Sequence, residues 1–151
     1  MAYDHLKQAI EFRKIFGQPF AKVKHRFPES DEIRNKLKMQ LSLIQEEGNE
    51  FNEALEIWQR MSQVSRGGVS PESLYGYKSE VFKELADLVY VCYQMAAFLE
   101  LDLDEALDRV HQSNLSKLDD NGRPIYNEYG KVMKGPNYKR PDLRDLVASP
   151  D

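Results

Sequence analysis

Residues 85–99, LADLVYVCYQMAAFL, form the stretch that decides the fold. Asp87 is its only charged residue, so a helix over this stretch would be apolar nearly all round, and we expect it to be buried. Upstream, residues 43–61 read LIQEEGNEFNEALEIWQRM, and their apolar residues recur at helical spacing. The two stretches together predict a pair of long packed helices, and therefore a helical protein.

A turn signal lies between these two helices, at residues 66–68, Arg-Gly-Gly. Two carboxylate pairs, Glu47 with Glu50 and Glu84 with Asp87, stand equally far from the turn on either side. Each pair has i, i+3 spacing, so both members project from one face of their helix. A helical hairpin that turns at residues 66–68 would therefore bring the four carboxylates level with one another.

The rest of the chain completes an all-α prediction. Helices are expected over residues 3–16, 30–61, 78–99 and 102–118, with Gly76 separating a short turn from the start of the third. Residues 119–151 are rich in Gly, Pro and Asn and are expected to form an irregular arm. We predict a single domain over residues 1–151: a four-helix bundle-type core over about 3–118 and a C-terminal arm over about 119–151, assembling as an oligomer.

The composition argues against several classes of protein. The length of 151 residues suits one ordinary domain, and a net charge of −4 gives no reason to expect binding to nucleic acid or to a membrane surface. Cys92 is the only cysteine, so no internal disulfide can form and a cytoplasmic location is expected. Residues 1–12 lack the apolar stretch of a signal peptide, and residues 85–99 are too few to span a bilayer.

The four carboxylates predict a metal site. Facing carboxylates repel one another unless a cation lies between them, and hard divalent cations such as Mg²⁺ take oxygen ligands of this kind. The competing interpretation of Glu47 and Glu50 is a solvated helix edge, which is the role we assign to Glu46. Glu80 lies one turn before Glu84 and either assists the metal or faces solvent. No Glu-x-x-His motif is present, which argues against a di-iron bundle.

A basic segment complements the acidic one. Residues 131–140, KVMKGPNYKR, contain four basic residues and no acidic one. Lysines stabilise the charge that develops on a departing pyrophosphate, while metal ions neutralise phosphate oxygens and activate a water. Asn114 and Lys117, again at i, i+3 spacing, are candidates for the same phosphates, and Tyr138 either stacks on a ligand or anchors the arm. The two segments together predict a polyphosphate site.

At this point the residues resemble a known family. The acidic run Glu46-Glu47-Gly48-Asn49-Glu50, followed by Glu84-Leu85-Ala86-Asp87, looks like the EExxE…ExxD signature of MazG-like, all-α nucleoside triphosphate pyrophosphohydrolases. Residues 113–143 are also similar to a C-terminal pattern of single-domain members. The resemblance covers roughly residues 4–143, and it departs from the pattern in a long spacer, around residues 61–77, of unassigned role.

The resemblance implies Mg²⁺-dependent hydrolysis between the α and β phosphates of a nucleoside triphosphate, by a homodimer or homotetramer, with Mn²⁺ as an alternative metal. Glu47 would also take the proton from the attacking water. The site residues that it implies are the metal ligands Glu47, Glu50, Glu84 and Asp87 and the phosphate contacts Asn114, Lys117, Lys131 and Lys134.

Two alternatives stay open at this point. One is a narrower relative, such as a dCTP or dUTP pyrophosphatase or a phosphoribosyl-ATP pyrophosphohydrolase. The other belongs to a different class of protein, a non-catalytic helical module that binds nucleotide or metal. Analysis of the reaction products over a panel of nucleotides separates all three.

Overall fold

The computed structural model describes residues 2–22, 30–64 and 67–147, and over these residues the chain is all-α. The described part contains five helices and no strand. Tyr126 and Val132 form an isolated antiparallel bridge. The helices are α1 (His5–Ile15), α2 (Asp31–Ser62), α3 (Pro71–Phe98), α4 (Leu103–Leu115) and α5 (Arg144–Val147). The predicted fold class is confirmed, and the short α5 is an element that the sequence did not predict.

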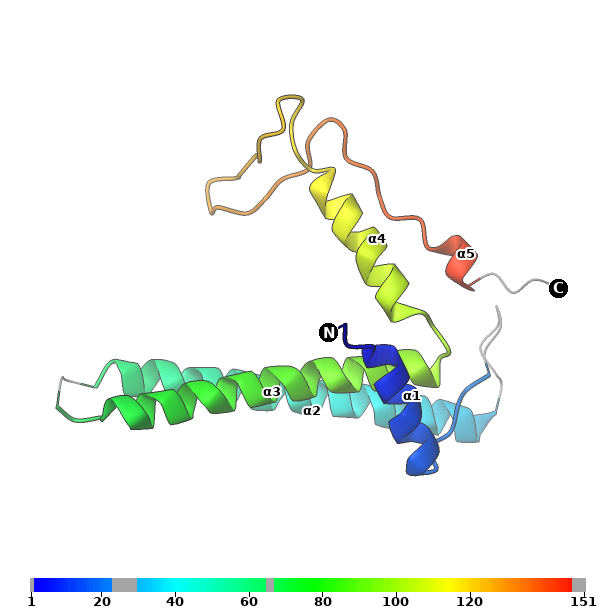
Figure 1. The fold of residues 1–151 in the computed structure, drawn as a ribbon, viewed down its shortest axis with the longest axis horizontal. Coiled ribbons are helices and arrows are strands. Elements are labelled where there is room, and N and C mark those ends of the chain that lie inside the picture. Colours follow the sequence, from blue (N-terminus) through cyan, green and yellow to red (C-terminus); the bar gives the residue numbers. More distant parts are fainter. Residues whose placement is uncertain (1, 23–29, 65–66, 148–151) are drawn as a thin grey trace. The chain divides into compact units, whose positions relative to one another are not determined.

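Helices α2 and α3 form the predicted antiparallel hairpin (Figure 1). Ser30 caps α2 by accepting a hydrogen bond from the backbone N–H of Ile33, and Ser70 caps α3 in the same way from Ser73. The turn between them contains Gly67 at a φ of 104°, a backbone conformation that favours glycine. Arg66, which is also part of the predicted turn signal, lies outside the described residues.

The expected break at Gly76 is wrong. Helix α3 runs without interruption from Pro71, so it begins seven residues before the predicted start at Lys78. Pro71 occupies the first turn, where its fixed φ suits a helix and its missing N–H costs no hydrogen bond. The cap and the proline together outweigh the roughly 1 kcal/mol penalty of an interior glycine.

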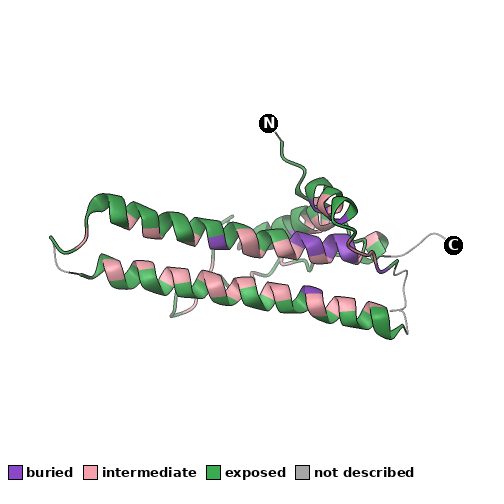
Figure 2. Cartoon of the chain, turned by 90° about the horizontal axis from the view of Figure 1, so that it is seen from below, coloured by how far each residue is buried: buried purple, intermediate pink, exposed green. Residues whose placement is uncertain are grey.

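The core of the hairpin lies where α1 packs on α3. Figure 2 shows the buried residues gathered in the C-terminal part of α3, and four of them there are Tyr93, Ala96, Ala97 and Phe98. The predicted burial of the whole stretch 85–99 is therefore wrong for the single chain. Leu85, Val89 and Tyr90 are 40%, 47% and 41% exposed, because α1 and α2 leave one side of α3 uncovered.

A buried arginine holds α1 in place, and sequence reasoning did not anticipate it. Arg13 is 1% exposed, and its guanidinium donates to the backbone carbonyl of Pro19 and to the side chain of Gln94. Gln94 donates in turn to the carbonyl of Ala9, and the ring of Phe98 lies 5.3 Å from the guanidinium carbon. Burial lowers the pKa of Arg13, but its donors are matched by acceptors from α3 and from the segment that follows α1.

Contacts divide the described residues into two units, one of residues 2–22, 30–64 and 67–100 and one of residues 101–147. In the second unit the arm folds back on the end of α4. The backbone N–H of Gly135 donates to the carbonyl of Lys117 at 2.9 Å, and a Cβ at Gly135 would lie 2.6 Å from the same oxygen. Ser113 Oγ donates to the carbonyl of Lys139, whose N–H donates to Ser116 Oγ. These contacts end α4 at Leu115, three residues before the predicted Leu118.

Membrane spanning receives no support from the described helices. None of them combines the length and the apolar character that crossing a bilayer requires.

We predict that Arg13→Ala lowers the free energy of unfolding by about 2 to 4 kcal/mol, because it leaves buried acceptors of Pro19 and Gln94 without donors. Urea denaturation followed by circular dichroism measures the loss. Arg34→Ala serves as the control, because Arg34 is an exposed arginine of α2. Equal stability of the two variants would show that the buried network does not hold α1.

Candidate functional site

The register of the hairpin brings carboxylates of α2 and α3 together. Glu47, Glu50 and Glu84 each offer one oxygen, and the three oxygens lie within 4.8 Å of one another. Glu84 is buried, at 9% exposed, whereas Glu47 and Glu50 are half-buried. Three like charges so close together, in a partly desolvated position, repel strongly. We call Glu47, Glu50 and Glu84 the carboxylate cluster.

Two oxygens of the carboxylate cluster are buried without a partner. No described residue donates a hydrogen bond to Glu47 Oε2 or to Glu84 Oε2. A buried acceptor that lacks a donor costs free energy, and the cost is greater when the group is charged. A proton or a bound cation at these oxygens would remove this cost.

The surroundings of Glu47 also disfavour its ionised form. Burial raises the pKa of Glu47, and the negative charges of Glu50, Asp87 and Glu84 raise it further. The positive charge of Lys83 acts in the opposite direction. Glu47 is therefore the carboxylate whose affinity for a proton is raised by its neighbours.

Asp87 is paired with a lysine rather than counted in the carboxylate cluster. Lys83 donates from Nζ to Asp87 Oδ2 at 2.9 Å and to Glu84 Oε1 at 3.0 Å, and these two acidic neighbours raise the pKa of the lysine. The Asp87 side chain is 41% exposed. In this structure Asp87 thus forms an ion pair with Lys83 at the protein surface. Ligation of a metal by Asp87 stays a prediction.

The carboxylate cluster fits a hard divalent cation. Its donors are all carboxylate oxygens, which suit Mg²⁺ or Mn²⁺ better than a soft metal. Two of those oxygens are buried and lack a donor, so a cation would satisfy them. Glu46, in contrast, is exposed, in agreement with its assignment to the wet face of α2.

A pocket of about 440 Å³ adjoins the carboxylate cluster between α2 and α3. Glu50 and Glu84 line it on one side, together with Tyr77 and Ile57, which sequence reasoning did not select. Glu80, left open between two roles, also lines this pocket. The lining residues are Glu50, Glu53, Ala54, Ile57, Tyr77, Glu80 and Glu84.

The family model of phosphoribosyl-ATP pyrophosphohydrolase matches residues 9–114. The chain belongs to this family. It is an all-α family of the nucleoside triphosphate pyrophosphatase type, related to MazG. A search of curated proteins gives no match to the chain. Membership in the phosphoribosyl-ATP pyrophosphohydrolase family implies a pyrophosphohydrolase, a hydrolase that acts on nucleotide phosphoanhydrides.

The family match divides the predicted site residues. The carboxylate cluster and Asp87 lie inside it, and Asn114 is its last residue. The arm residues Lys131, Lys134 and Tyr138 lie beyond it. They belong to the second unit, where the ammonium of Lys134 lies 4.7 Å from the centroid of the Tyr138 ring.

Asn114 and Lys117 also belong to the second unit, at the end of α4. The Asn114 carbonyl accepts a hydrogen bond from the Lys117 N–H at 3.2 Å, and the Asn114 side chain is exposed. Within this unit Asn114, Lys131 and Lys134 are exposed.

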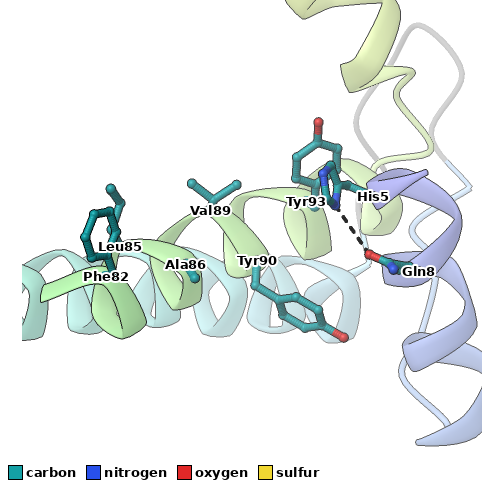
Figure 3. A pocket seen from close by; sticks show the side chains of 8 residues that line it. All are labelled: His5, Gln8, Phe82, Leu85, Ala86, Val89, Tyr90 and Tyr93. Carbon is teal, nitrogen blue, oxygen red and sulfur yellow. Dashed lines mark hydrogen bonds between the residues drawn. The ribbon is translucent and has the colours of Figure 1, made fainter. Parts of the chain in front are cut away.

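A second hollow in the first unit, of about 400 Å³, has a different character. Figure 3 shows it between α1 and α3, lined by Phe82, Leu85 and Val89 and closed at one end by His5 and Gln8, which are hydrogen-bonded. Its lining is predominantly apolar and contains no carboxylate. Its lining therefore lacks the carboxylate oxygens that a hard divalent cation prefers.

We predict that Glu47→Gln stabilises the protein at pH 8 when a chelator removes divalent cations. A carboxyl group whose pKa is raised on folding contributes stability below its unfolded pKa and loses that contribution as pH rises through its folded pKa. The advantage of the glutamine should therefore be present at pH 8 and vanish toward pH 4. Urea midpoints at the two pH values measure it, with Glu56→Gln on the exposed face of α2 as control. A constant difference between the pH values would contradict the raised pKa.

Proposed function

We propose that this protein hydrolyses a nucleoside or deoxynucleoside triphosphate between its α and β phosphates, with Mg²⁺ as cofactor, to give a nucleoside monophosphate and pyrophosphate. The observation that carries the proposal is the carboxylate cluster, whose oxygens come from both helices and lie within 4.8 Å of one another. It occurs in a member of a pyrophosphohydrolase family.

The carboxylate cluster would hold the metal, with Asp87 as a fourth ligand. When bound, Mg²⁺ neutralises phosphate oxygens and makes a water more acidic. Mn²⁺ would substitute, because it takes the same oxygen ligands.

Glu47 is our candidate for the general base. Its raised pKa makes it a stronger base than an ordinary carboxylate, and an efficient base has a pKa closer to the working pH. One carboxylate oxygen of Glu47 would hold the metal, and the other would accept a proton from the water that attacks the α phosphorus.

The basic arm would bind the departing pyrophosphate. Lys131 and Lys134 are exposed and carry positive charge that offsets the charge of the phosphate oxygens. Asn114 and Lys117 would add a hydrogen bond and a further positive charge at the end of α4. Tyr138, under the ammonium of Lys134, would orient that lysine.

The arm also bears on the choice of substrate. The family description names phosphoribosyl-ATP, and this compound is one candidate substrate. The arm lies beyond the family match, however, and it resembles the C-terminal pattern of single-domain MazG-like enzymes, so we favour a nucleoside triphosphate, including dCTP or dUTP as narrower choices.

We further propose that the protein works as a single-domain homodimer or homotetramer in the cytoplasm. The uncovered side of α3 exposes Phe82, Leu85, Val89 and Tyr90, and apolar residues that are contiguous on a surface mark an interface. The single cysteine, Cys92, supports the cytoplasmic location, because one cysteine cannot form an internal disulfide.

We predict that Glu50→Gln and Asp87→Asn each lower turnover at least about a hundredfold, because each weakens the metal site that neutralises the phosphates. The assay incubates protein and Mg²⁺ with eight NTPs and dNTPs and with phosphoribosyl-ATP, and identifies the products. Monophosphate and pyrophosphate from a triphosphate support the proposal, whereas diphosphate and orthophosphate contradict it.

Glu56→Gln is the matched control for these variants, because Glu56 lies on the exposed face of α2. It should keep the wild-type rate. Cleavage of phosphoribosyl-ATP alone would select the alternative named by the family, and nucleotide binding without any product would select the non-catalytic module.

We predict that Val89→Glu converts the oligomer to monomers, because it places a charge in the apolar face of α3. Light scattering after size-exclusion chromatography should give the mass of one chain, 17.6 kDa, for the variant and a multiple of it for the wild type. Ile15→Glu, at an exposed residue that ends α1, is the control and should keep the wild-type mass. A wild-type mass of one chain would contradict the proposed oligomer.

A further inference from the structure

The ammonium of Lys83 lies between the carboxylates of two acidic residues of α3, Glu84 and Asp87. Its ammonium donates to Glu84 Oε1 at 3.0 Å and to Asp87 Oδ2 at 2.9 Å. The spacing explains the geometry, because a residue four positions on lies over the same face of a helix and a long side chain reaches the next residue as well. Lys83 therefore bridges a member of the carboxylate cluster and the residue that stands outside it.

The ammonium of Lys83 offsets the negative charge of the carboxylates, as a metal ion would. Four carboxylates, those of the cluster and Asp87, create a strongly negative field, and Lys83 places a positive charge at its edge. An ammonium offers only donors, so it cannot join a metal as a ligand of the cation. A divalent cation and the ammonium would repel each other across the shared carboxylates.

Lys83 is also able to leave. Its side chain is 58% exposed and sits on a flexible four-carbon stem, so an ammonium released from Asp87 enters water. Glu84, by contrast, has a side chain only 12% exposed and stays in place. The exposed contact of Lys83 with Asp87 can thus be displaced, whereas the carboxylate of Glu84 is fixed in place.

We propose that Lys83 is a tethered competitor of the divalent cation: its ammonium pairs with Asp87 and Glu84 and thereby lowers the affinity of the site for the metal. Lys83 is a positioning residue in this role, since it acts through Asp87 and Glu84. The proposal rests on the metal site of the proposed function, but it concerns the affinity of that site and not the reaction.

The test is a titration with Mn²⁺ alone, in which the free ion is measured by electron paramagnetic resonance. Lys83→Met removes the charge and keeps the stem. Its dissociation constant for Mn²⁺ should fall at least about threefold below that of the wild type, because one competing positive charge is gone. Lys83→Arg keeps the charge and the donors, and it should bind Mn²⁺ as the wild type does.

Lys38→Met is the matched control, because Lys38 is an exposed lysine of α2 and its loss changes the net charge equally. It should leave the dissociation constant unchanged. A second readout is the melting temperature in chelator, which should fall in Lys83→Met, since Glu84 and Asp87 then repel without a bridge. Circular dichroism confirms that each variant keeps its helices.

The outcomes separate the two proposals. Equal or weaker Mn²⁺ binding by Lys83→Met, or tighter binding by Lys83→Arg to the same extent, overturns the role of Lys83 while the proposed hydrolysis stands on the wild-type products. Loss of Mn²⁺ binding in every protein, including the wild type, overturns the metal site itself and the role of Lys83 with it. Tighter binding by Lys83→Met in a protein that forms no product supports Lys83 and contradicts the hydrolysis.

Discussion

Repulsion among the acidic residues of α2 and α3 is the constraint on which the functional part of the structure depends. The antiparallel packing of the hairpin sets the register, and the register places Glu47 and Glu50 opposite Glu84. Apolar residues at these positions would stabilise the helix pair, whereas three carboxylates oppose its formation. The rest of the hairpin must therefore outweigh that repulsion unless a proton or a cation neutralises part of the charge.

Two kinds of buried polar group in this chain illustrate the difference between support and function. Arg13 has its donors matched by carbonyl and amide oxygens, so it serves to fasten α1 to α3. Glu47 and Glu84 each keep a buried oxygen without a donor among the described residues. A buried polar group with a hydrogen-bond partner stabilises a fold. A buried carboxylate oxygen without a donor favours the binding of a proton or a cation.

The first unit is more exposed than its sequence suggests. Helix α3 is apolar over most of its circumference, yet its buried apolar residues all lie in its C-terminal part. The uncovered side ends close along the helix to Glu84 and Asp87, so a second copy on this face would also change the surroundings of the acidic residues. Oligomerisation and metal binding are therefore expected to be linked.

The sequence by itself determined the helices, the hairpin and the acidic pairs, because caps, glycines and helical periodicity are local signals that neighbouring residues decide. It also placed Glu47, Glu50 and Glu84 opposite one another, since equal spacing about a turn fixes the register of two straight helices. Only the tertiary structure decided that Arg13 is buried, that Lys83 pairs with Asp87, and that Tyr77 lines a pocket. Such outcomes depend on which long side chains reach a partner across or along the helices, and that competition is settled by distance and solvent exposure rather than by any pattern along the chain.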